Sequence, residues 1–344
     1  MLCWCRSGKG FWLSLGLPLS AGVLFAANKA WIFVGIILVI IPAFDAFLGR
    51  GAPLQRAEVE HTTERQVPCW FALCWAMALA IAAHKSITAA PLEFIGLVVA
   101  CGALSATAMA HLHELGHRSG SLWQAISDIA FTVAGYPHYR FSHNLHHAHL
   151  GDPSFGSTAP MGTSSWKHAG RSYLLALRAS ANFRSYEDLA IPRAVLRNIL
   201  IALLLVAVPF GLHAWQMAIF FLGYALVSVF IVETVGYMQH YGLDNHSARN
   251  AIHSWDVDFW LSNCLLVNNG NHGVHHEQGE SPYSRLTPTS ATLPGGYFQM
   301  LWLSLVPPLW FSVMDRRVEV LTKRRRRQLV AIHDQFCRDL GEVA

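Results

Sequence analysis

Charged side chains are scarce in this sequence. Asp, Glu, Lys and Arg make up only 13% of the 344 residues, whereas 53% are hydrophobic and the mean hydropathy is +0.32. A soluble globular domain usually carries about 25% charged residues, so this chain has too few to cover a water-facing surface of its size. The scarcity excludes an ordinary soluble protein and indicates that lipid solvates the surplus apolar surface.

The spacing of the cysteines shows no recognisable motif. The seven cysteines form neither a disulfide framework nor a zinc-binding spacing. Most of them lie in apolar runs, where a free cysteine behaves as a small hydrophobic residue. This excludes a disulfide-stabilised secreted protein and fits a protein that faces the reducing cytoplasm.

Long apolar runs are what the sequence has instead. A bilayer core about 30 Å thick is crossed by a helix of about 20 apolar residues. The sequence predicts an all-α membrane bundle of six transmembrane helices, near 11–28, 30–49, 68–84, 92–112, 195–213 and 215–237. A further apolar stretch, 297–314, is interrupted by Pro307 and Pro308, and we expect it to be interfacial or re-entrant.

The basic residues predict the orientation of this bundle. Positive charge accumulates on cytoplasmic loops, and the opposite side would retain little more than Lys29 and Lys85. We expect both termini in the cytoplasm, with 1–344 as a single domain whose catalytic portions, 113–194 and 238–344, form a cytoplasmic cap. The basic run 323–327 is then expected to be a cytoplasmic flank or a contact with lipid headgroups, and not a nucleic-acid site. The residues assigned to the cytoplasm are Arg6, Lys9, Arg50, Arg56, Arg65 and the cluster 316–327.

Histidine is frequent and clustered, with 19 in the chain. The sequence HELGH at 113–117 lies at the cytoplasmic end of the fourth predicted segment. On a helix, the i, i+4 spacing places His113 and His117 on one face, one turn apart. HExxH is also the zinc metalloprotease signature, but a catalytic zinc needs only three protein ligands, fewer than this sequence supplies.

Two further boxes share the pattern HxxHH, at 143–147 and 272–276. Adjacent histidines on a helix point about 100° apart, so each can face a different metal position. His240, at the end of the sixth segment, completes the set. Isolated histidines such as His84 and His213 are expected to be ordinary. The predicted metal ligands are His113, His117, His143, His146, His147, His240, His272, His275 and His276.

Nine imidazoles exceed the needs of one metal ion, so the sequence predicts two. Imidazole suits iron, copper, zinc and nickel, and the boxes hold no cysteine that would indicate an iron–sulfur cluster. A pair of iron ions can activate O2 and oxidise an unactivated C–H bond, and an apolar substrate arriving from lipid would explain the membrane location. A metal transporter is the alternative from another class, but transporters place their ligands near the bilayer midplane, whereas these boxes lie at helix ends.

Carboxylates near the boxes are candidates to support the ligands, because a ligating histidine usually donates its other N–H to a carboxylate or carbonyl. Glu233 precedes His240 by seven residues and shares its helix face. Asp45 is an ionisable group at the end of the second segment, where such groups tend to be functional. We predict a supporting role in catalysis for these two residues.

The order of HExxH, the two HxxHH boxes and the segment QHYG at 239–242 resembles the membrane fatty-acid desaturase/hydroxylase superfamily. The segment 237–243 is most similar to the alkane 1-monooxygenase and xylene monooxygenase branch. The resemblance covers the motifs between about 100 and 290 and the spacing of apolar segments along the whole chain. It implies a cytoplasmic di-iron site, a hydrophobic channel, hydroxylation of a terminal methyl group, and an electron donor of the rubredoxin or ferredoxin type with its reductase, in a bacterial inner membrane.

Two departures from the alkane branch affect the details. The second box has two residues before its histidine pair where the alkane branch has three, so His143 has the least support from the resemblance. Gln239 stands where many alkane enzymes have Glu. The substrate therefore stays open among alkane-like, alkyl-aromatic and fatty acyl compounds, and an alkene-forming, desaturase-type oxidation at the same site is the alternative reaction.

Overall fold

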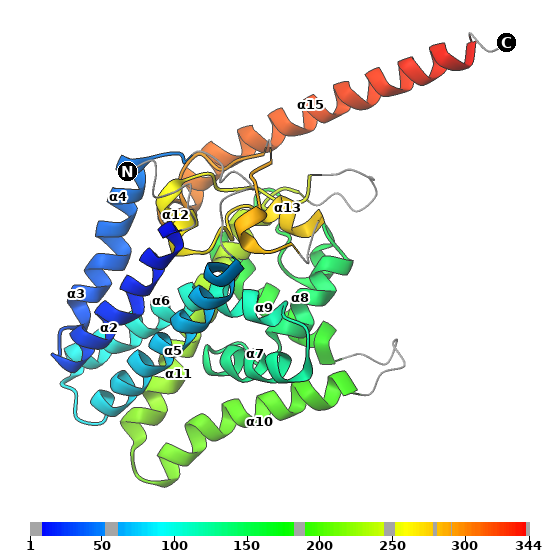
Figure 1. Ribbon diagram of the computed structural model, residues 1–344. Helices are drawn as coiled ribbons and strands as arrows, with labels where there is room; N and C mark the ends of the chain where they lie inside the picture. Colours follow the sequence, from blue (N-terminus) through cyan, green and yellow to red (C-terminus); the bar gives the residue numbers. More distant parts are fainter. Residues whose placement is uncertain are drawn as a thin grey trace.

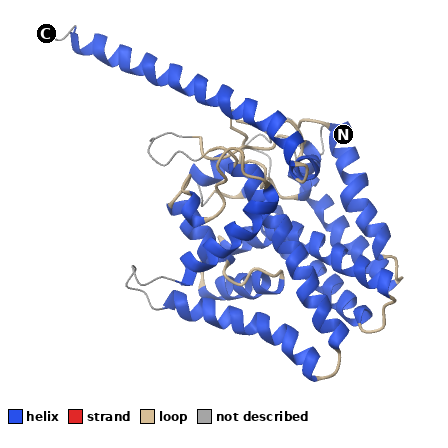
Figure 2. Cartoon of the chain, turned by 180° about the vertical axis from the view of Figure 1, so that it is seen from behind, coloured by secondary structure: helices blue, strands red, loops and turns tan. Residues whose placement is uncertain are grey.

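Figure 1 shows a computed structural model of the protein, which describes residues 9–51, 61–181, 190–243, 252–277, 281–289 and 291–341. The regular elements in this part of the chain are helices, without a β-strand (Figure 2). The predicted all-α class is therefore confirmed. Arg6 and Arg56, which contributed to the predicted orientation, lie outside the described residues.

The membrane-spanning candidates match the predicted segments closely. Within the described ranges, five helices are long and apolar enough to cross a bilayer. The first predicted segment forms a shorter apolar helix, Gly10–Ala26, near the lower end of the spanning range. The elements are η1 (Lys9–Leu15), α2 (Gly16–Ala26), α3 (Ala30–Gly35), the π-helical η2 (Ile36–Ile40), α4 (Ile41–Leu48), α5 (His61–Ser86), α6 (Pro91–Gly116), α10 (Ala190–Gly211) and α11 (Trp215–His240).

Shorter helices lie between and after these spans. The pair α14 and α15 is bent by 117° at the break before Pro307, which fits the re-entrant or interfacial course predicted from the two prolines. Beyond this bend α15 projects away from the rest of the protein (Figures 1 and 2). The elements are α7 (Ser121–Val133), α8 (Tyr139–Ala148), η3 (Pro153–Phe155), α9 (Ser165–Ala181), α12 (Trp260–Leu265), α13 (His272–Glu277), η5 (Tyr283–Arg285), α14 (Tyr297–Ser304) and α15 (Pro307–Gly341).

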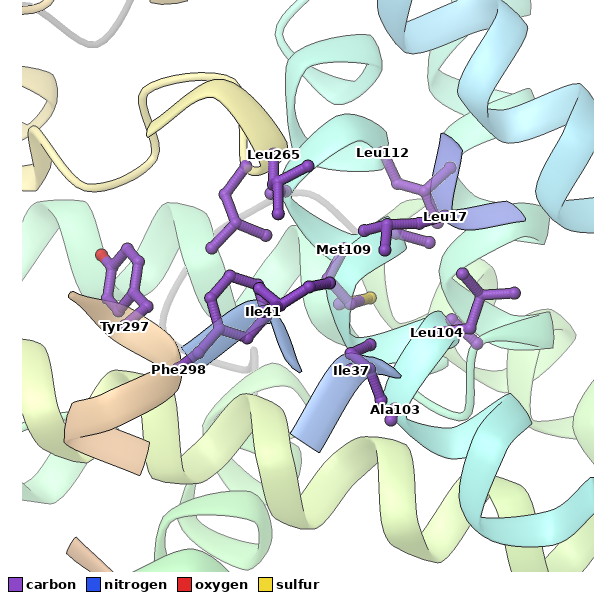
Figure 3. Packing of buried hydrophobic residues seen from close by; sticks show 14 of the residues in the cluster. Leu17, Ile37, Ile41, Ala103, Leu104, Met109, Leu112, Leu265, Tyr297 and Phe298 are labelled. Carbon is purple, nitrogen blue, oxygen red and sulfur yellow. The ribbon is translucent and has the colours of Figure 1, made fainter. Parts of the chain in front are cut away.

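The core lies around α6, the most buried of the candidate spans: 61% of an 18-residue apolar stretch is buried in α6, against 11% in α10. Small residues let α6 approach α11 closely. A Cβ atom placed on Gly102 would lie only 2.4 Å from the Cβ of Val227. Figure 3 shows Ala103, Leu104 and Met109 of this core among the buried side chains of neighbouring elements. The tight packing fixes the C-terminal ends of α6 and α11, where the histidines begin.

Candidate metal centre

Four helices bring the predicted histidines to one place. HELGH spans the C-terminus of α6, where His113 lies in the last turn and His117 caps the helix. The second box lies on α8, His240 is the last residue of α11, and the third box begins α13. Each box is local in sequence, but the centre forms only when the ends of these helices meet.

The imidazoles form two groups of four. In each group, one ring nitrogen from every histidine lies within 4.8 Å of the others. Each group draws on three helices, and α8 and α13 contribute to both. The first cluster consists of His113, His117, His143 and His275, and the second of His146, His240, His272 and His276.

The ninth predicted ligand, His147, lies at the junction of the clusters. Its Nε2 is 2.9 Å from Nε2 of His143 in the first cluster. Its ring centroid is 4.8 Å from that of His275 and 4.6 Å from that of His276, one from each cluster. The structure thus brings all nine histidines together, including His143 despite its shortened box, and gives His147 a bridging position.

The spacing of the ring nitrogens fits a shared cation. Nε2 of His113 is 2.8 Å from Nε2 of His143 and 2.9 Å from Nε2 of His117. A neutral imidazole nitrogen carries either one hydrogen or one lone pair, so it cannot form two good hydrogen bonds of this kind at once. Ligands about 2.1 Å from a metal at right angles are about 3 Å apart. Among the described residues, the buried Nε2 of His275 also has no hydrogen-bond partner, and a metal ion would satisfy it.

Burial keeps these imidazoles neutral, as metal ligands must be. It lowers the pKa of His147 to about 4 and that of His275 to about 3, with a smaller contribution from neighbouring imidazoles. The pKa values of His143 and His146 are also well below the usual range for the same reasons. At neutral pH the lone pairs of these rings are therefore available to a cation.

Backbone and carboxylate groups orient individual ligands. Nδ1 of His240 donates to the backbone carbonyl of His253 at 2.6 Å, which leaves the lone pair of Nε2 free to bind a metal in the second cluster. Oε1 of Glu114 lies 3.6 Å from Nδ1 of His113. The hydrogen bond to His253 fixes the tautomer of His240, whereas Glu114 lies near His113 without a hydrogen bond.

Asp256 is a supporting residue that the sequence did not reveal. Its Oδ1 accepts a hydrogen bond from the backbone N–H of Gly273 at 2.7 Å, and its Oδ2 accepts one from Thr289 at 2.6 Å. It therefore holds the start of α13, which carries the third box. Burial raises the pKa of Asp256 to about 6. No spacing rule connects a carboxylate to a helix sixteen residues later, so only the fold identifies it.

The two predicted supporting carboxylates contact other groups. Glu233 is buried and accepts hydrogen bonds from the hydroxyls of Tyr136 and Ser172. Asp45 accepts hydrogen bonds from the backbone N–H and the hydroxyl of Ser262, at 2.9 and 2.6 Å. The structure thus places both acids in contacts between helices and not beside an imidazole, although Glu233 also lines the cavity next to the clusters.

Comparison with known proteins bears directly on this centre. A family model for fatty acid desaturases matches residues 89–300, more than half of the chain, and this range includes all nine histidines. The chain belongs to the fatty acid desaturase family. Membership implies a membrane oxidoreductase that uses non-haem iron and O2, and the two groups of imidazoles fit iron as the bound metal.

Within the fatty acid desaturase family, the chain is similar to alkane and xylene monooxygenases over most of its length. It is 28% identical to alkane 1-monooxygenase 1 of Pseudomonas aeruginosa, over 93% of this chain and 92% of that protein. It is 25% identical to alkane 1-monooxygenase of Acinetobacter baylyi, over 92% and 87%. Its identity to the xylene/toluene monooxygenase hydroxylase component XylM of Pseudomonas putida is 24%, over 73% and 71%. The predicted resemblance to this branch is confirmed.

A cavity of about 140 Å³ adjoins both clusters of this desaturase-family protein. His113 and His143 of the first cluster and His146, His240 and His272 of the second line it. The remaining wall is largely apolar, with Met109, Ile231, Val232, Phe298 and Leu301 among its side chains. A metal held by these histidines would therefore face an apolar group in the cavity.

Proposed function

We propose that this protein is an O2-dependent non-haem di-iron monooxygenase that hydroxylates a terminal methyl group of a hydrophobic substrate. One observation carries the proposal: two adjacent groups of four imidazoles face a single, largely apolar cavity. Eight such donors exceed the coordination of one ion, so each group would hold one iron, with His147 at the junction. The similarity to alkane 1-monooxygenases supports this choice of reaction.

The overall reaction consumes O2, two electrons and two protons for each substrate methyl group, and it yields a primary alcohol and water. The bound irons would supply the activation of O2 that C–H oxidation requires. Apolar side chains such as Ile231 and Phe298 would orient the substrate methyl group and exclude water. Gln239 donates to the hydroxyl of Tyr297 at 2.6 Å, and Tyr297 donates to the carbonyl of Asn269 at 3.0 Å, which steadies the loop that enters α13.

The same comparison supports a proposal for the substrate class and the partners. We propose an alkane-like substrate, with alkyl-aromatic and fatty acyl compounds as the nearest relatives in chemistry, because the similar proteins are named for alkanes and for xylene and toluene. A rubredoxin or ferredoxin-type protein with its reductase would deliver the electrons. We further propose a single domain, 1–344, in a bacterial inner membrane with both termini in the cytoplasm.

Alkene formation is the second candidate reaction, because the matching family is named for fatty acid desaturases. Both reactions begin by removing hydrogen from a C–H bond. They differ in whether oxygen is then inserted or a second hydrogen is removed, so product analysis separates them.

The test is mass spectrometry of products from cells that express the chain with a compatible reductase under ¹⁸O2. The cells receive an alkane, a fatty acid and a xylene. We expect a hydroxylated product that carries ¹⁸O, and no such product from a His146→Ala variant. His84→Ala is the matched control and should retain activity, because His84 is exposed outside both clusters. Alkene products would favour desaturation. Iron-loaded protein without O2-dependent products would favour a metal-binding transporter and contradict the proposal.

A further inference from the structure

One part of the wall of the metal cavity is polar without belonging to the histidine clusters. Glu233 of α11 and Ser172 of α9 line the cavity together with Tyr136. The hydroxyls of Tyr136 and Ser172 are hydrogen-bonded to the carboxyl group of Glu233. Glu233 is 5% exposed, and no lysine or arginine among the described residues forms an ion pair with it. The cavity therefore contains an acid that is buried without a counter-ion.

Such an acid is suited to carry a proton. An ionised carboxylate in an apolar environment is strongly disfavoured, so a buried carboxyl group without a cation tends to retain its proton. A protonated carboxyl group has one O–H to donate and can still accept hydrogen bonds. Glu233 can thus accept hydrogen bonds from Tyr136 and Ser172 and still offer a proton to the cavity that it lines.

His168 lies next to this acid along the interface of α9 and α11. It precedes Ser172 by about one helical turn, so the two side chains share a face of α9. On α11, Glu233 and Tyr237 have the same spacing. Ser172 contacts Glu233, and the ring centroid of His168 lies 5.5 Å from that of Tyr237. The two helices thus run antiparallel here, and His168 lies one turn beyond Ser172 along their interface.

The ring nitrogens of His168 indicate a place for water at this interface. The residue is 1% exposed, and neither nitrogen has a hydrogen-bond partner among the described residues. Buried polar groups are nearly always hydrogen-bonded, often to buried water. Burial lowers the pKa of His168 to about 4, so the ring is neutral at neutral pH and carries one N–H and one lone pair. A ring of this kind can take up a proton at one nitrogen as it releases one from the other.

Beyond His168, hydrogen-bonding side chains continue to a partly exposed carboxylate. The ring centroids of Tyr237 and Tyr241, one turn apart at the C-terminal end of α11, are 5.2 Å from each other. The hydroxyl of Tyr241 donates to Oδ1 of Asp315 on α15 at 2.5 Å, and Asp315 is partly exposed. Protonatable side chains therefore follow one another from the surface beside α15 to Glu233 in the cavity.

We propose that Glu233 donates the protons that the oxidation consumes, and that His168 and Ser172 return protons to it from the side of α15. The inference rests on the proposed function, because an O2-dependent hydroxylation takes up two protons, and two electrons from the donor protein, for each O2. One oxygen atom enters the alcohol and the other leaves as water. In each transfer the O–H bond of Glu233 breaks, the hydroxyls of Tyr136 and Ser172 stabilise the carboxylate, and a proton passed on by His168 restores the acid.

The experiment follows the infrared C=O band of Glu233 at neutral pH while H2O is replaced by D2O. Full-length, iron-loaded protein in lipid vesicles is used without O2, so the readout is independent of turnover. A protonated carboxyl group absorbs apart from ionised carboxylates, and its band shifts when deuterium replaces the proton. Glu233 is the only buried glutamate among the described residues, so ¹³C-labelled glutamate assigns the band without a variant. We expect the band in the wild type, its loss in Glu233→Gln, and exchange about tenfold slower in His168→Phe, the effect of losing about one hydrogen bond from the path.

Ser172→Ala should slow the exchange in the same way. Ser180→Ala is its matched control on α9 and should exchange like the wild type, because Ser180 donates to the backbone carbonyl of Ala176 and does not line the cavity. His168→Gln should restore most of the rate, because it keeps hydrogen-bonding atoms at this position. Absence of the protonated band in the wild type, or equal exchange rates in His168→Phe and Ser180→Ala, would overturn the inference. The expected exchange rates without any O2-dependent product would instead refute the proposed function alone.

Discussion

Most imidazoles of the two clusters have lowered pKa values because they are largely removed from water, as for His147 and His275. A free histidine has a pKa of about 6.5, whereas the pKa is about 4 for His147 and about 3 for His275. Since these values are lowered, protons compete with a metal ion only below them, and binding is lost as the pH falls through that range. This separates the centre from a surface cluster of histidines.

The iron content should therefore be insensitive to pH from neutrality down to about 5 and should fall steeply near pH 4 to 3. The measurement is the iron-to-protein ratio after dialysis at a series of pH values. Half-loss of iron near pH 6.5 would contradict the assigned burial, because unperturbed imidazoles titrate there.

Asp256 gives a second test at the level of one residue. Asp256→Ala leaves the N–H groups of Gly273 and Thr289 without their acceptor, so α13 should lose its fixed position. We expect metal affinity to fall about 10- to 100-fold, as is usual when a partner that orients a ligand is removed. Iron titration of the purified protein measures the change.

Asp258→Ala is the control for Asp256. Asp258 lies two residues away and pairs with a half-exposed Arg50, and such surface pairs contribute about 0–1 kcal/mol. It should bind iron like the wild-type protein. The same loss of affinity in both variants would show that the loop as a whole, and not Asp256, supports α13.

The individual boxes could be predicted from the sequence, but their assignment to clusters could not. The pairing of His113 with His117 in HELGH could be predicted because their spacing matches one helical turn. His143 and His275, however, join the first cluster with α6, while His146 and His276 join the second. These pairings depend on how α8 and α13 are placed in space, which no local pattern encodes. The hydrogen bond between Asp256 and Gly273 of α13 could not be predicted for the same reason.

Among the helices, the connection from α7 to α8 requires a glycine at position 135. Gly135 has a φ of +99°, and a Cβ atom there would lie 2.9 Å from the Cα of Ala225 in α11. Backbone atoms cannot move aside as a flexible side chain can. The turn therefore needs glycine for its conformation and for its close approach to α11.

Gly135→Ala should lower the free energy of unfolding by about 1–3 kcal/mol, the usual cost of a strained backbone position, with the steric contact as an addition. Thermal unfolding in detergent, followed by tryptophan fluorescence, measures the effect. Gly211→Ala is the control, because nothing lies within 4 Å of a Cβ atom at Gly211. A melting temperature for Gly135→Ala at or above that of the wild type would contradict this account.

The long apolar helices were predicted well, and the short ones were not. Scarcity of charge and runs of about 20 apolar residues suffice to predict spans, and the two prolines at 307 and 308 predicted the bend before α15. The amphipathic helices α7 and α9 were not predicted, because polar residues interrupt their apolar residues along the sequence. On α7, Leu122, Ile126 and Ile129 recur at helical spacing and are exposed, which suits a helix lying at a membrane surface.

At the scale of the whole molecule, the distribution of apolar surface separates lipid contact from the metal centre. Only 11% of an 18-residue apolar stretch of α10 is buried, whereas the ends of α6 and α11 meet the cap that carries the histidines. The low charge of the chain fits long helices whose apolar side chains are exposed, as on α10. The metal centre lies at the C-terminal ends of α6 and α11.

Each cluster should depend on its own ligands. His275→Ala removes a donor of the first cluster, and His146→Ala removes one of the second. We expect each variant to lose iron and activity while its membrane insertion, measured by fractionation, stays unchanged. His84→Ala should keep its iron. Full iron content in either cluster variant would remove that residue from the ligand set.

The most direct test of the account is the metal content of the full-length wild-type protein purified from membranes. Two irons per chain are expected, one for each group of four imidazoles. A ratio of one iron or none after iron loading, or stoichiometric zinc in place of iron, would contradict the di-iron centre from which the proposed oxidation follows.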